Sequence, residues 1–401
     1  MNTTRARLAT VPERSQRVLL WHWGNAGAGA KFSYELAREL RNVPDIELTI
    51  CVAEGTELAD LAAADPNIMT RTVHTYNGNK FSWQGKLNAA LSILRLRRLT
   101  HEFRTILIDC QTDVAICPFQ AIWDVAAIPV LRRHAKRFIL FPHEAKFNVG
   151  DRYPFRESVL RWEIANADAL IVLSDHVGRS AEMLYKFPAD RIWSIPHGAF
   201  SFGTAEARPR ISPTNRSFRL LFFGHIKKYK GLGHLLDAYR ILRNRGVAVS
   251  LDIVGSGSLT AYTSQIDGLS DVSITNAFVD EEQIQNAFAR ADIVILPYIE
   301  ASQSGVAAAA LTAAIPIVAT PVGGLKEQVC NGQTGVIAKS IGPEDIACAI
   351  QSLIDDPLLY ETCSAGALRY SQEKLSWSMI ATEVANIVKQ VSSRPSRRGH
   401  L

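Results

Sequence analysis

The sequence predicts an α/β protein with two doubly wound domains, each containing a parallel sheet that helices cover on both faces. Three observations support this prediction. The chain has 401 residues, whereas one domain usually has about 100 to 200. Short apolar runs alternate with amphipathic stretches of helix length, a pattern typical of parallel sheets in α/β proteins. The pattern occurs twice, on either side of a stretch (203–217) that contains prolines and small polar residues and has no apolar periodicity.

The individual apolar runs predict the strands. Short runs bounded by turn signals are typical of strands that are buried in a sheet. In the first half these runs are Arg17–Trp21, Ile46–Val52, Thr105–Asp109, Phe138–Phe141 and Ala169–Leu173. In the second half they are Phe218–Phe223, Val249–Val254, Val272–Thr275, Asp292–Leu296 and Pro316–Ala319.

These elements give an expected domain organisation. A helical stretch follows the second series, and both ends of the chain are polar. We expect a flexible N-terminus (1–16), an N-terminal domain (17–205), a linker (206–217), a C-terminal domain (218–370), a C-terminal helix packing across the joint (371–391) and a disordered tail (392–401).

Composition excludes several classes of function. Lys and Arg number 44 against 39 Asp and Glu, a net charge of +5, which is too mild for a typical nucleic-acid-binding protein but leaves room for an anionic substrate. The six cysteines form no C-x-x-C pair, so we expect reduced thiols and neither a disulfide framework nor a metal site. The polar first residues and the absence of a long apolar run favour a cytoplasmic protein without a membrane span.

A glycine-rich turn follows the first predicted strand. Gly24, Gly27 and Gly29 precede a predicted helix that begins near Lys31. The N–H groups at a helix start can bind a phosphate or a sugar hydroxyl. The order G-x-x-G-x-G differs from the dinucleotide fingerprint G-x-G-x-x-G, and such a turn is also common as a purely structural element.

A cationic turn follows the first strand of the second half. Gly224 is followed by His225, Lys227, Lys228 and Lys230. Ligands of doubly wound domains bind at the carboxyl ends of the strands, and a diphosphate suits these cations. The alternative is a solvated basic loop.

A third candidate segment precedes the Ala-rich helix expected at 307–314. Small polar residues at a helix start leave backbone N–H groups accessible, and Glu300 just upstream can accept hydrogen bonds from hydroxyl groups. The alternative is that Glu300 and Ser302 only cap the helix.

In order and spacing these segments resemble glycosyltransferase family 4, in particular a bacterial polysaccharide-type subgroup with the sequence EASQSGV. The resemblance spans most of the chain. Its other motifs are VGSGS with Gly255 and Gly257, ADIVILP at 291–297, IVATPVGG at 317–324 and PHEAKFNVGD at 142–151.

The resemblance implies a GT-B fold, in which two Rossmann-like domains enclose a cleft. It further implies a metal-independent retaining hexosyltransferase without a cofactor, acting in polysaccharide biosynthesis. The N-terminal domain would bind a glycan or lipid-linked acceptor, and the C-terminal domain would bind a nucleotide-diphosphate sugar. No D-x-D sequence, the metal-binding motif of the other major glycosyltransferase fold, occurs in the chain.

The resemblance also implies roles for single residues. Lys230 would stabilise the departing diphosphate, Glu300 would orient the donor sugar, and His143 would contact that sugar near the reaction centre. His197, in a tight Pro-His-Gly turn, is expected to be structural as often as functional. The remaining donor-binding positions are Gly224, His225, Lys228, Gly255, Val279, Gln303, Ser304, Gly305 and Val306.

Two positions depart from the family pattern. His225 stands where the family usually has an arginine, and Ala309 stands where a second glutamate is expected. One alternative is therefore a non-catalytic partner subunit that binds sugar nucleotides. The other is an NAD-dependent dehydrogenase that uses the turn at Gly24 and Glu54 as the ribose acceptor.

A basic amphipathic helix is expected at 86–104, just after Phe81 and Trp83. Arg95 and Arg98 lie largely off its apolar stripe. Such a helix can lie on an anionic membrane surface. The alternative is that the stripe packs on the first sheet while the arginines are solvated.

Overall fold

The computed structural model describes residues 15–25, 27–75, 83–134, 136–146, 156–200 and 207–397, with side chains except at 83–94. The chain forms two compact units, residues 1–139 with 381–397 and residues 140–380 with 398–401. Most of the expected flexible N-terminus and the end of the expected tail lie outside the described residues. So do Phe81 and the side chain of Trp83.

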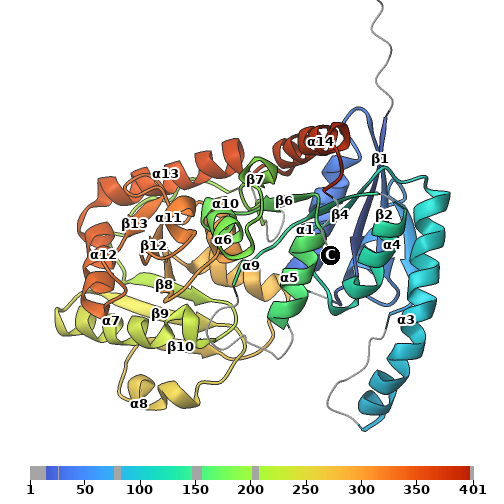
Figure 1. The fold of residues 1–401 in the computed structure, drawn as a ribbon. Coiled ribbons are helices and arrows are strands. Elements are labelled where there is room, and N and C mark those ends of the chain that lie inside the picture. Colours follow the sequence, from blue (N-terminus) through green and yellow to red (C-terminus); the bar gives the residue numbers. More distant parts are fainter. Residues whose placement is uncertain are drawn as a thin grey trace, which may run out of the picture. The chain divides into compact units, whose positions relative to one another are not determined.

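The first sheet is parallel and has the strand order β3-β2-β1-β4-β5-β6-β7. Its strands are β1 (Gln16–His22), β2 (Ile46–Ala53), β3 (Met69–Val73), β4 (Val114–Cys117), β5 (Arg137–Leu140), β6 (Ala169–Val172) and β7 (Ile192–Ser194). The helices between them are α1 (Ala28–Leu40), α2 (Glu57–Ala63), α3 (Trp83–Asp109), α4 (Ala127–Arg133), α5 (Arg156–Asn166) and α6 (Asp175–Tyr185) (Figure 1).

The second sheet is also parallel and has the strand order β10-β9-β8-β11-β12-β13. Its strands are β8 (Phe218–Phe223), β9 (Val249–Val254), β10 (Val272–Thr275), β11 (Ile293–Leu296), β12 (Ile317–Ala319) and β13 (Gly335–Ile337). Its helices are α7 (Leu232–Asn244), α8 (Thr263–Ile266), α9 (Glu281–Arg290), α10 (Gly305–Thr312), α11 (Leu325–Gln328), α12 (Pro343–Asp355) and α13 (Pro357–Lys374). The last described helix is α14 (Trp377–Ser393), most of which belongs to the first unit.

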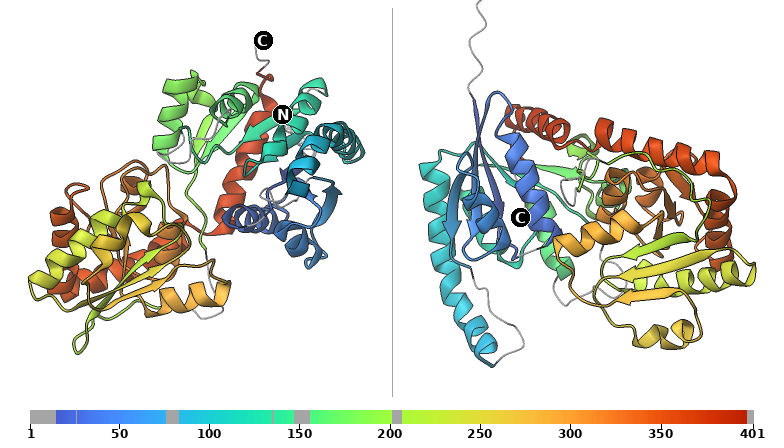
Figure 2. Two further views of the ribbon diagram at one scale, coloured as in Figure 1. Left: turned by 90° about the horizontal axis from the view of Figure 1, so that it is seen from below. Right: turned by 180° about the vertical axis from the view of Figure 1, so that it is seen from behind.

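Helices lie on both sides of the second sheet, as Figure 2 shows from two further directions. One apolar core joins β8, β9 and β11 to α7, α12 and α13, with Leu220, Ile253 and Ile295 on the sheet and Leu235 and Ile350 on the helices. The strand order is that of a dinucleotide-binding Rossmann domain. The predicted fold class, an α/β protein with two doubly wound Rossmann-like domains, is confirmed.

One predicted strand is wrong. Thr105–Asp109 forms the last turns of α3, and the neighbouring strand is β4. Ile106 and Leu107 are buried together with Leu99 and Phe103. These spacings of three and four residues continue the apolar stripe of one helix, so the short run belongs to the helix and not to a strand.

The residues around the linker and the C-terminus are well anchored where the structure describes them. Arg210 donates hydrogen bonds from its guanidinium to the carbonyl of Ala291 (2.7 Å) and from its backbone N–H to the Ser364 hydroxyl (2.7 Å).

The helical stretch expected up to Val391 is two helices, because α13 ends at Lys374 and α14 begins at Trp377. Within the first unit, the Arg394 carbonyl accepts a hydrogen bond from Arg137.

Candidate functional site

The candidate site lies where the order of the second sheet reverses. β8 and β11 are neighbours at its centre, and the chain leaves them toward opposite edges. Ligands usually bind outside the carboxyl ends of two such strands in this architecture. Here this position, which we call the crevice, is bounded by the turn that begins at Gly224, the loop that begins at Pro297 and the start of α10.

Glycines allow these two loops to lie against each other. Gly231 has a left-handed backbone (φ 69°), and a Cβ at that position would lie 1.8 Å from the carbonyl oxygen of Pro297. No side chain fits there. The N–H of Ile299 donates a hydrogen bond to the carbonyl of Tyr229 (2.7 Å) and closes the contact. The cationic turn is thereby held in register with the loop after β11.

This register brings Lys230 to the centre of the crevice. Its Nζ donates a hydrogen bond to the Tyr298 hydroxyl (3.1 Å) and lies 5.0 Å from the centre of that ring. The same Nζ is 3.0 Å from the position that a Cβ of Gly224 would occupy, and Cγ2 of Val306 is 3.8 Å from it. The structure therefore brings together three of the predicted residues, Gly224, Lys230 and Val306.

The start of α10 forms the other side of the crevice. Ser304 caps the helix, since its Oγ accepts a hydrogen bond from the N–H of Ala307 (3.3 Å). The Ser304 N–H is itself occupied, because it donates to Oε1 of Gln328 (2.7 Å), while Nε2 of Gln328 donates to the Ser304 carbonyl (3.2 Å). Within the described part of the chain, the N–H groups of Gly305 and Val306 have no acceptor, so these two can bind an anion.

The end of β9 lines the same edge of the sheet. A Cβ on Gly255 would lie 2.1 Å from the Gly224 carbonyl, so a glycine is needed at position 255 for the two strand ends to approach each other. His225 is exposed and shares a hydrogen bond between its Nδ1 and the Ser256 hydroxyl (3.0 Å). The side-chain amide of Asn276 holds Gly257 through two hydrogen bonds of 3.0 Å.

The imidazole of His197 packs against the start of α10. Its Nε2 is 3.5 Å from the position that a Cβ of Gly305 would occupy, and its ring centre is 5.0 Å from that of Phe200. Nδ1 donates a hydrogen bond to the Gly198 carbonyl (2.9 Å), and burial lowers the pKa of His197 to about 4. The imidazole is therefore neutral at pH 7.

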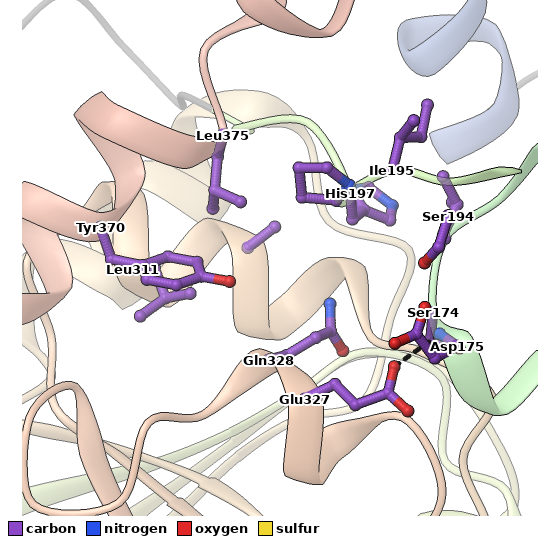
Figure 3. Close-up of a pocket in the computed structure, with 13 residues that line it drawn as sticks. Ser174, Asp175, Ser194, Ile195, His197, Leu311, Glu327, Gln328, Tyr370 and Leu375 are labelled. Atoms are coloured by element: carbon purple, nitrogen blue, oxygen red, sulfur yellow. Dashed lines mark hydrogen bonds between the residues drawn. The ribbon is translucent and has the colours of Figure 1, made fainter. Parts of the chain in front are cut away.

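A pocket of about 220 Å³ lies beside His197. Figure 3 shows Gln328, Tyr370 and His197 around it, and Leu311 of α10 also lines it. Ala308 and Leu311 lie on a different face of α10 from Val306, because successive residues are rotated by about 100° around the helix axis. The pocket thus adjoins a face of α10 that differs from the face at Lys230, and Gln328, which holds Ser304, is part of its lining.

A second set of contacts fixes the loop that precedes α10. The hydroxyl of Ser174 donates to the carbonyl of Ser302 (2.8 Å). The Glu327 carboxylate accepts hydrogen bonds from the N–H groups of Asp175 and His176, at 2.6 and 3.0 Å, and caps the start of α6. A carboxylate is favourable at a helix N-terminus.

The other predicted residues differ in exposure. Glu300 and Lys228 are exposed, Val279 is buried and His143 is half-buried. The Oε1 atom of Gln303 is buried and has no hydrogen-bond partner among the described residues. The position of the missing glutamate, Ala309, is buried within α10.

The glycine turn of the first sheet is filled by protein groups. A Cβ on Gly24 would lie 2.5 Å from Nε2 of His22, and one on Gly29 would lie 2.8 Å from the ring of Phe119. The Gly27 N–H donates to the Glu57 carboxylate (2.7 Å), which occupies a donor that a phosphate would need. The proposed ribose acceptor of the dehydrogenase alternative, Glu54, pairs instead with His74 (3.1 Å).

The described part of α3 packs into the first unit. The Phe103 ring lies 5.8 Å from that of Trp21 and 5.2 Å from that of Trp23. Arg98 donates to the Glu102 carboxylate (2.6 Å), and Arg95 is exposed. No described helix is both long and apolar enough to cross a membrane. The described residues also contain no group of three or more His, Cys, Asp or Glu side chains that could hold a metal ion.

Sequence reasoning missed two residues of the site, Tyr298 and Gln328. Tyr298 directly follows the strand and proline of ADIVILP, so its place at a strand end was a usable signal. Gln328 lies on the short helix α11 and reaches Ser304 across 24 residues of sequence. No local pattern indicates such a contact.

Two family models match the chain, one on each side of the linker. The model described as Glycosyltransferase Family 4 matches residues 29–199. The model described as Glycosyl transferases group 1 matches residues 217–356.

Curated relatives match part of their length. The glycogen synthase of Mycobacterium tuberculosis is 29% identical over 238 residues, which are 57% of this chain and 56% of that protein. The D-inositol 3-phosphate glycosyltransferase of Paenarthrobacter aurescens is 31% identical over 172 residues, 41% of this chain and 42% of that protein. The chain thus spans about half the length of these curated relatives.

Similarity to a solved structure extends over nearly the whole chain. Anabaena Alr3699/HepE, in complex with UDP, has a TM-score of 0.68 and 15% identity, covering 94% of this chain and all of that one. At this identity the comparison shows the fold alone. A glycosyltransferase family model therefore matches most of each half of the chain, and the two-domain fold is similar to that of HepE.

Proposed function

We propose that this chain is a retaining glycosyltransferase that transfers a sugar from a nucleotide-diphosphate sugar to a hydroxyl group of a glycan or lipid-linked acceptor. The observation that carries the proposal is the convergence of Lys230 and the start of α10 on Gly224 at the reversal point of the second sheet. HepE binds UDP and UDP-glucose in its solved structures, and its fold is similar to this one.

The proposed chemistry follows from where charge develops. Breaking the bond between the sugar and the diphosphate leaves negative charge on the phosphate oxygens. A fixed cation and fixed N–H groups stabilise such charge without rearrangement during the reaction. Lys230 would supply the cation, and Gly305 and Val306 would supply the N–H groups. Glu300 and His143 would contact the donor sugar.

We further propose that transfer needs no metal ion. The role that a divalent cation has in other phosphate-transferring sites would fall to Lys230 and the start of α10. Transfer should therefore survive exhaustive chelation. If EDTA abolishes transfer and a divalent cation restores it, the assignment of these groups is wrong.

Attachment to an anionic membrane surface through α3 is part of the proposal, in keeping with a lipid-linked acceptor in polysaccharide synthesis. Arg95 is exposed and is the better candidate contact, because Glu102 offsets part of the charge of Arg98.

The experiment that tests the function measures two quantities with one panel of nucleotide sugars. Binding is measured by calorimetry, and turnover is measured by release of nucleoside diphosphate in the presence of candidate acceptors. If the protein is a glycosyltransferase, it binds at least one nucleotide sugar of the panel and transfers its sugar to an acceptor. Binding without turnover would favour the non-catalytic partner subunit, for which Ala309 is the supporting observation, and absence of binding would exclude both functions.

A further inference from the structure

We propose that Tyr298 is a positioning residue that holds the ammonium group of Lys230 where the departing diphosphate binds. The inference rests on the proposed function and goes beyond it, because the cation alone does not require this partner. Tyr298 is only 2% exposed, whereas Lys230 is half-buried. The buried partner is the fixed member of the pair.

The hydroxyl of Tyr298 binds the ammonium group. It accepts a hydrogen bond from Nζ at 3.1 Å, and Nζ lies on the hydroxyl side of the ring, 5.0 Å from the ring centre. A lysine side chain has several rotatable bonds and otherwise distributes its charge over many positions. A hydrogen bond to a buried, fixed hydroxyl restricts the ammonium group to one of them.

Tyr298 is itself held on two other sides. Its carbonyl accepts a hydrogen bond from the Thr320 hydroxyl (2.6 Å), which fixes the main chain after β11. Its ring meets that of Tyr229 edge to face, with the ring centres 6.4 Å apart. Tyr229 lies in the cationic turn directly before Lys230. The contact between the rings therefore joins the two loops at the point where Lys230 leaves the backbone.

The Tyr298 hydroxyl also links the cation to α10. An ammonium group can only donate, so the phenolic oxygen accepts from Lys230. The Tyr298 hydrogen is then available to the Ser304 Oγ, which lies 3.3 Å away. Ser304 is the cap of α10, the helix with the free N–H groups of Gly305 and Val306. One hydroxyl thus sets the spacing between the cation and the helix start that would both bind the diphosphate.

This arrangement predicts a specific kinetic defect. Without the hydroxyl, Lys230 keeps its charge but not its position. Stabilisation that depends on position is lost mainly in the transition state, so kcat falls more than KM rises. Hydrogen bonds to charged groups correspond to losses of about tenfold to a hundredfold. We expect a loss of about tenfold in kcat for Tyr298→Phe.

The matched control is Tyr239→Phe. Tyr239 is also fully buried in the second unit, and its hydroxyl donates to the Ser270 carbonyl (2.8 Å), remote from Lys230 in the fold. Both variants lose one buried tyrosine hydroxyl. A general loss of stability therefore affects both, whereas a loss of Lys230 positioning affects only Tyr298→Phe.

The first measurement needs no substrate. The wild type and both variants are labelled with an amine-reactive ester, and mass spectrometry follows modification of Lys230 relative to the exposed Lys339. We expect Lys230 to react several-fold faster in Tyr298→Phe and at the wild-type rate in Tyr239→Phe. Equal rates in all three proteins would overturn the proposal.

The second measurement is a double-mutant cycle on turnover. If Tyr298 acts through Lys230, then Tyr298→Phe has little further effect in a Lys230→Ala background, whereas independent residues give a full additive loss. Wild-type kcat in Tyr298→Phe together with an inactive Lys230→Ala would overturn this inference and leave the proposed function intact. A wild-type protein that turns over no nucleotide sugar would instead overturn the proposed function, and this role of Tyr298 with it.

Discussion

Among single residues, the proposed site depends most on the ammonium group of Lys230. It lies between the Tyr298 hydroxyl and the backbone of Gly224, where a side chain on residue 224 would crowd it. The sequence indicates both Gly224 and Lys230, because a glycine and a cluster of cations follow a buried strand. The sequence does not indicate that the N–H of Ser304 donates a hydrogen bond to Gln328, because these two residues are remote in sequence.

Replacing Lys230 with alanine should abolish most turnover while the fold is retained. Loss of one preorganised electrostatic contact costs about 2.7 to 4 kcal/mol in the transition state, a factor of roughly 100 to 1000 in kcat. The control is Lys339→Ala, which removes an exposed lysine outside the crevice. Steady-state kinetics and thermal unfolding of both variants provide the measurement. Wild-type kcat in Lys230→Ala would remove this residue from the mechanism.

At the scale of elements, the site depends on two loops that approach more closely than side chains permit. The cationic turn meets the loop after β11 at Gly231, whose missing side chain makes room for the Pro297 carbonyl. Strands β8 and β11 could be predicted from their apolar runs. Their adjacency could be predicted only through the fold class, since strand order depends on pairings between distant segments.

Replacement of Gly231 should cost more stability and turnover than replacement of another glycine with similar backbone geometry. Gly246 also has a positive φ (75°), but a Cβ there would meet nothing within 4 Å. Gly246→Ala should cost about 1 kcal/mol of stability, from backbone strain alone. Gly231→Ala should cost at least about 2 kcal/mol and most of the turnover. Equal losses of stability, measured by urea unfolding, would show that the close approach of the loops is not needed.

We predict that the protein binds anionic membranes through helix α3. The wild type should sediment with anionic vesicles at low salt and not at high salt, since each cation near the surface contributes about 1 kcal/mol. Arg95→Glu combined with Arg98→Glu should lose this binding. The double variant Arg290→Glu and Lys339→Glu changes the net charge equally at exposed positions on other elements and should retain it. If the α3 variant binds as the wild type does, or the wild type does not bind, α3 serves packing only.

At the scale of the whole molecule, the two sheets could be predicted better at their centres than at their edges. Three strands that the sequence did not indicate, β3, β7 and β13, lie at sheet edges, and the fourth, β4, lies inside the first sheet directly after the segment 105–109 that was predicted as a strand. Edge strands are covered on fewer sides, and only Val73 of β3 is buried. Their sequences therefore lack the continuous apolar run that marks a central strand. The segment 105–109 was wrongly predicted as a strand for a different reason, since a buried helix end is as apolar as a buried strand.

The folded state should lose stability in mild acid because it keeps histidines neutral. Burial lowers the pKa of His22 to about 4, while its Nδ1 shares a hydrogen bond with the Ser33 hydroxyl (3.0 Å). In the unfolded chain the pKa is about 6.5, so protons bind preferentially to the unfolded state between these values. The stability contribution is present above pH 6.5 and is lost as the pH falls toward 4.

His22→Asn should make the first unit less sensitive to acid. The wild type should lose about 2 kcal/mol more than the variant between pH 7 and pH 5. The pKa of Asp124, which burial raises to about 6, acts in the opposite direction but is present in both proteins. Hydrogen exchange of the β1 amides, measured against urea at both pH values, gives the local free energy of unfolding. The same acid sensitivity in both proteins would refute the assignment of a buried neutral His22.

A crystal structure of this protein with a bound nucleoside diphosphate tests whether the diphosphate binds at Lys230 and the start of α10. We expect a terminal phosphate at the carboxyl end of β8 and β11, within hydrogen-bond distance of Lys230 Nζ and of the N–H groups of Gly305 or Val306. The Lys230 ammonium should still be held by the Tyr298 hydroxyl. A nucleotide bound instead at the glycine turn of the first sheet, or in the pocket beside His197, would contradict the account.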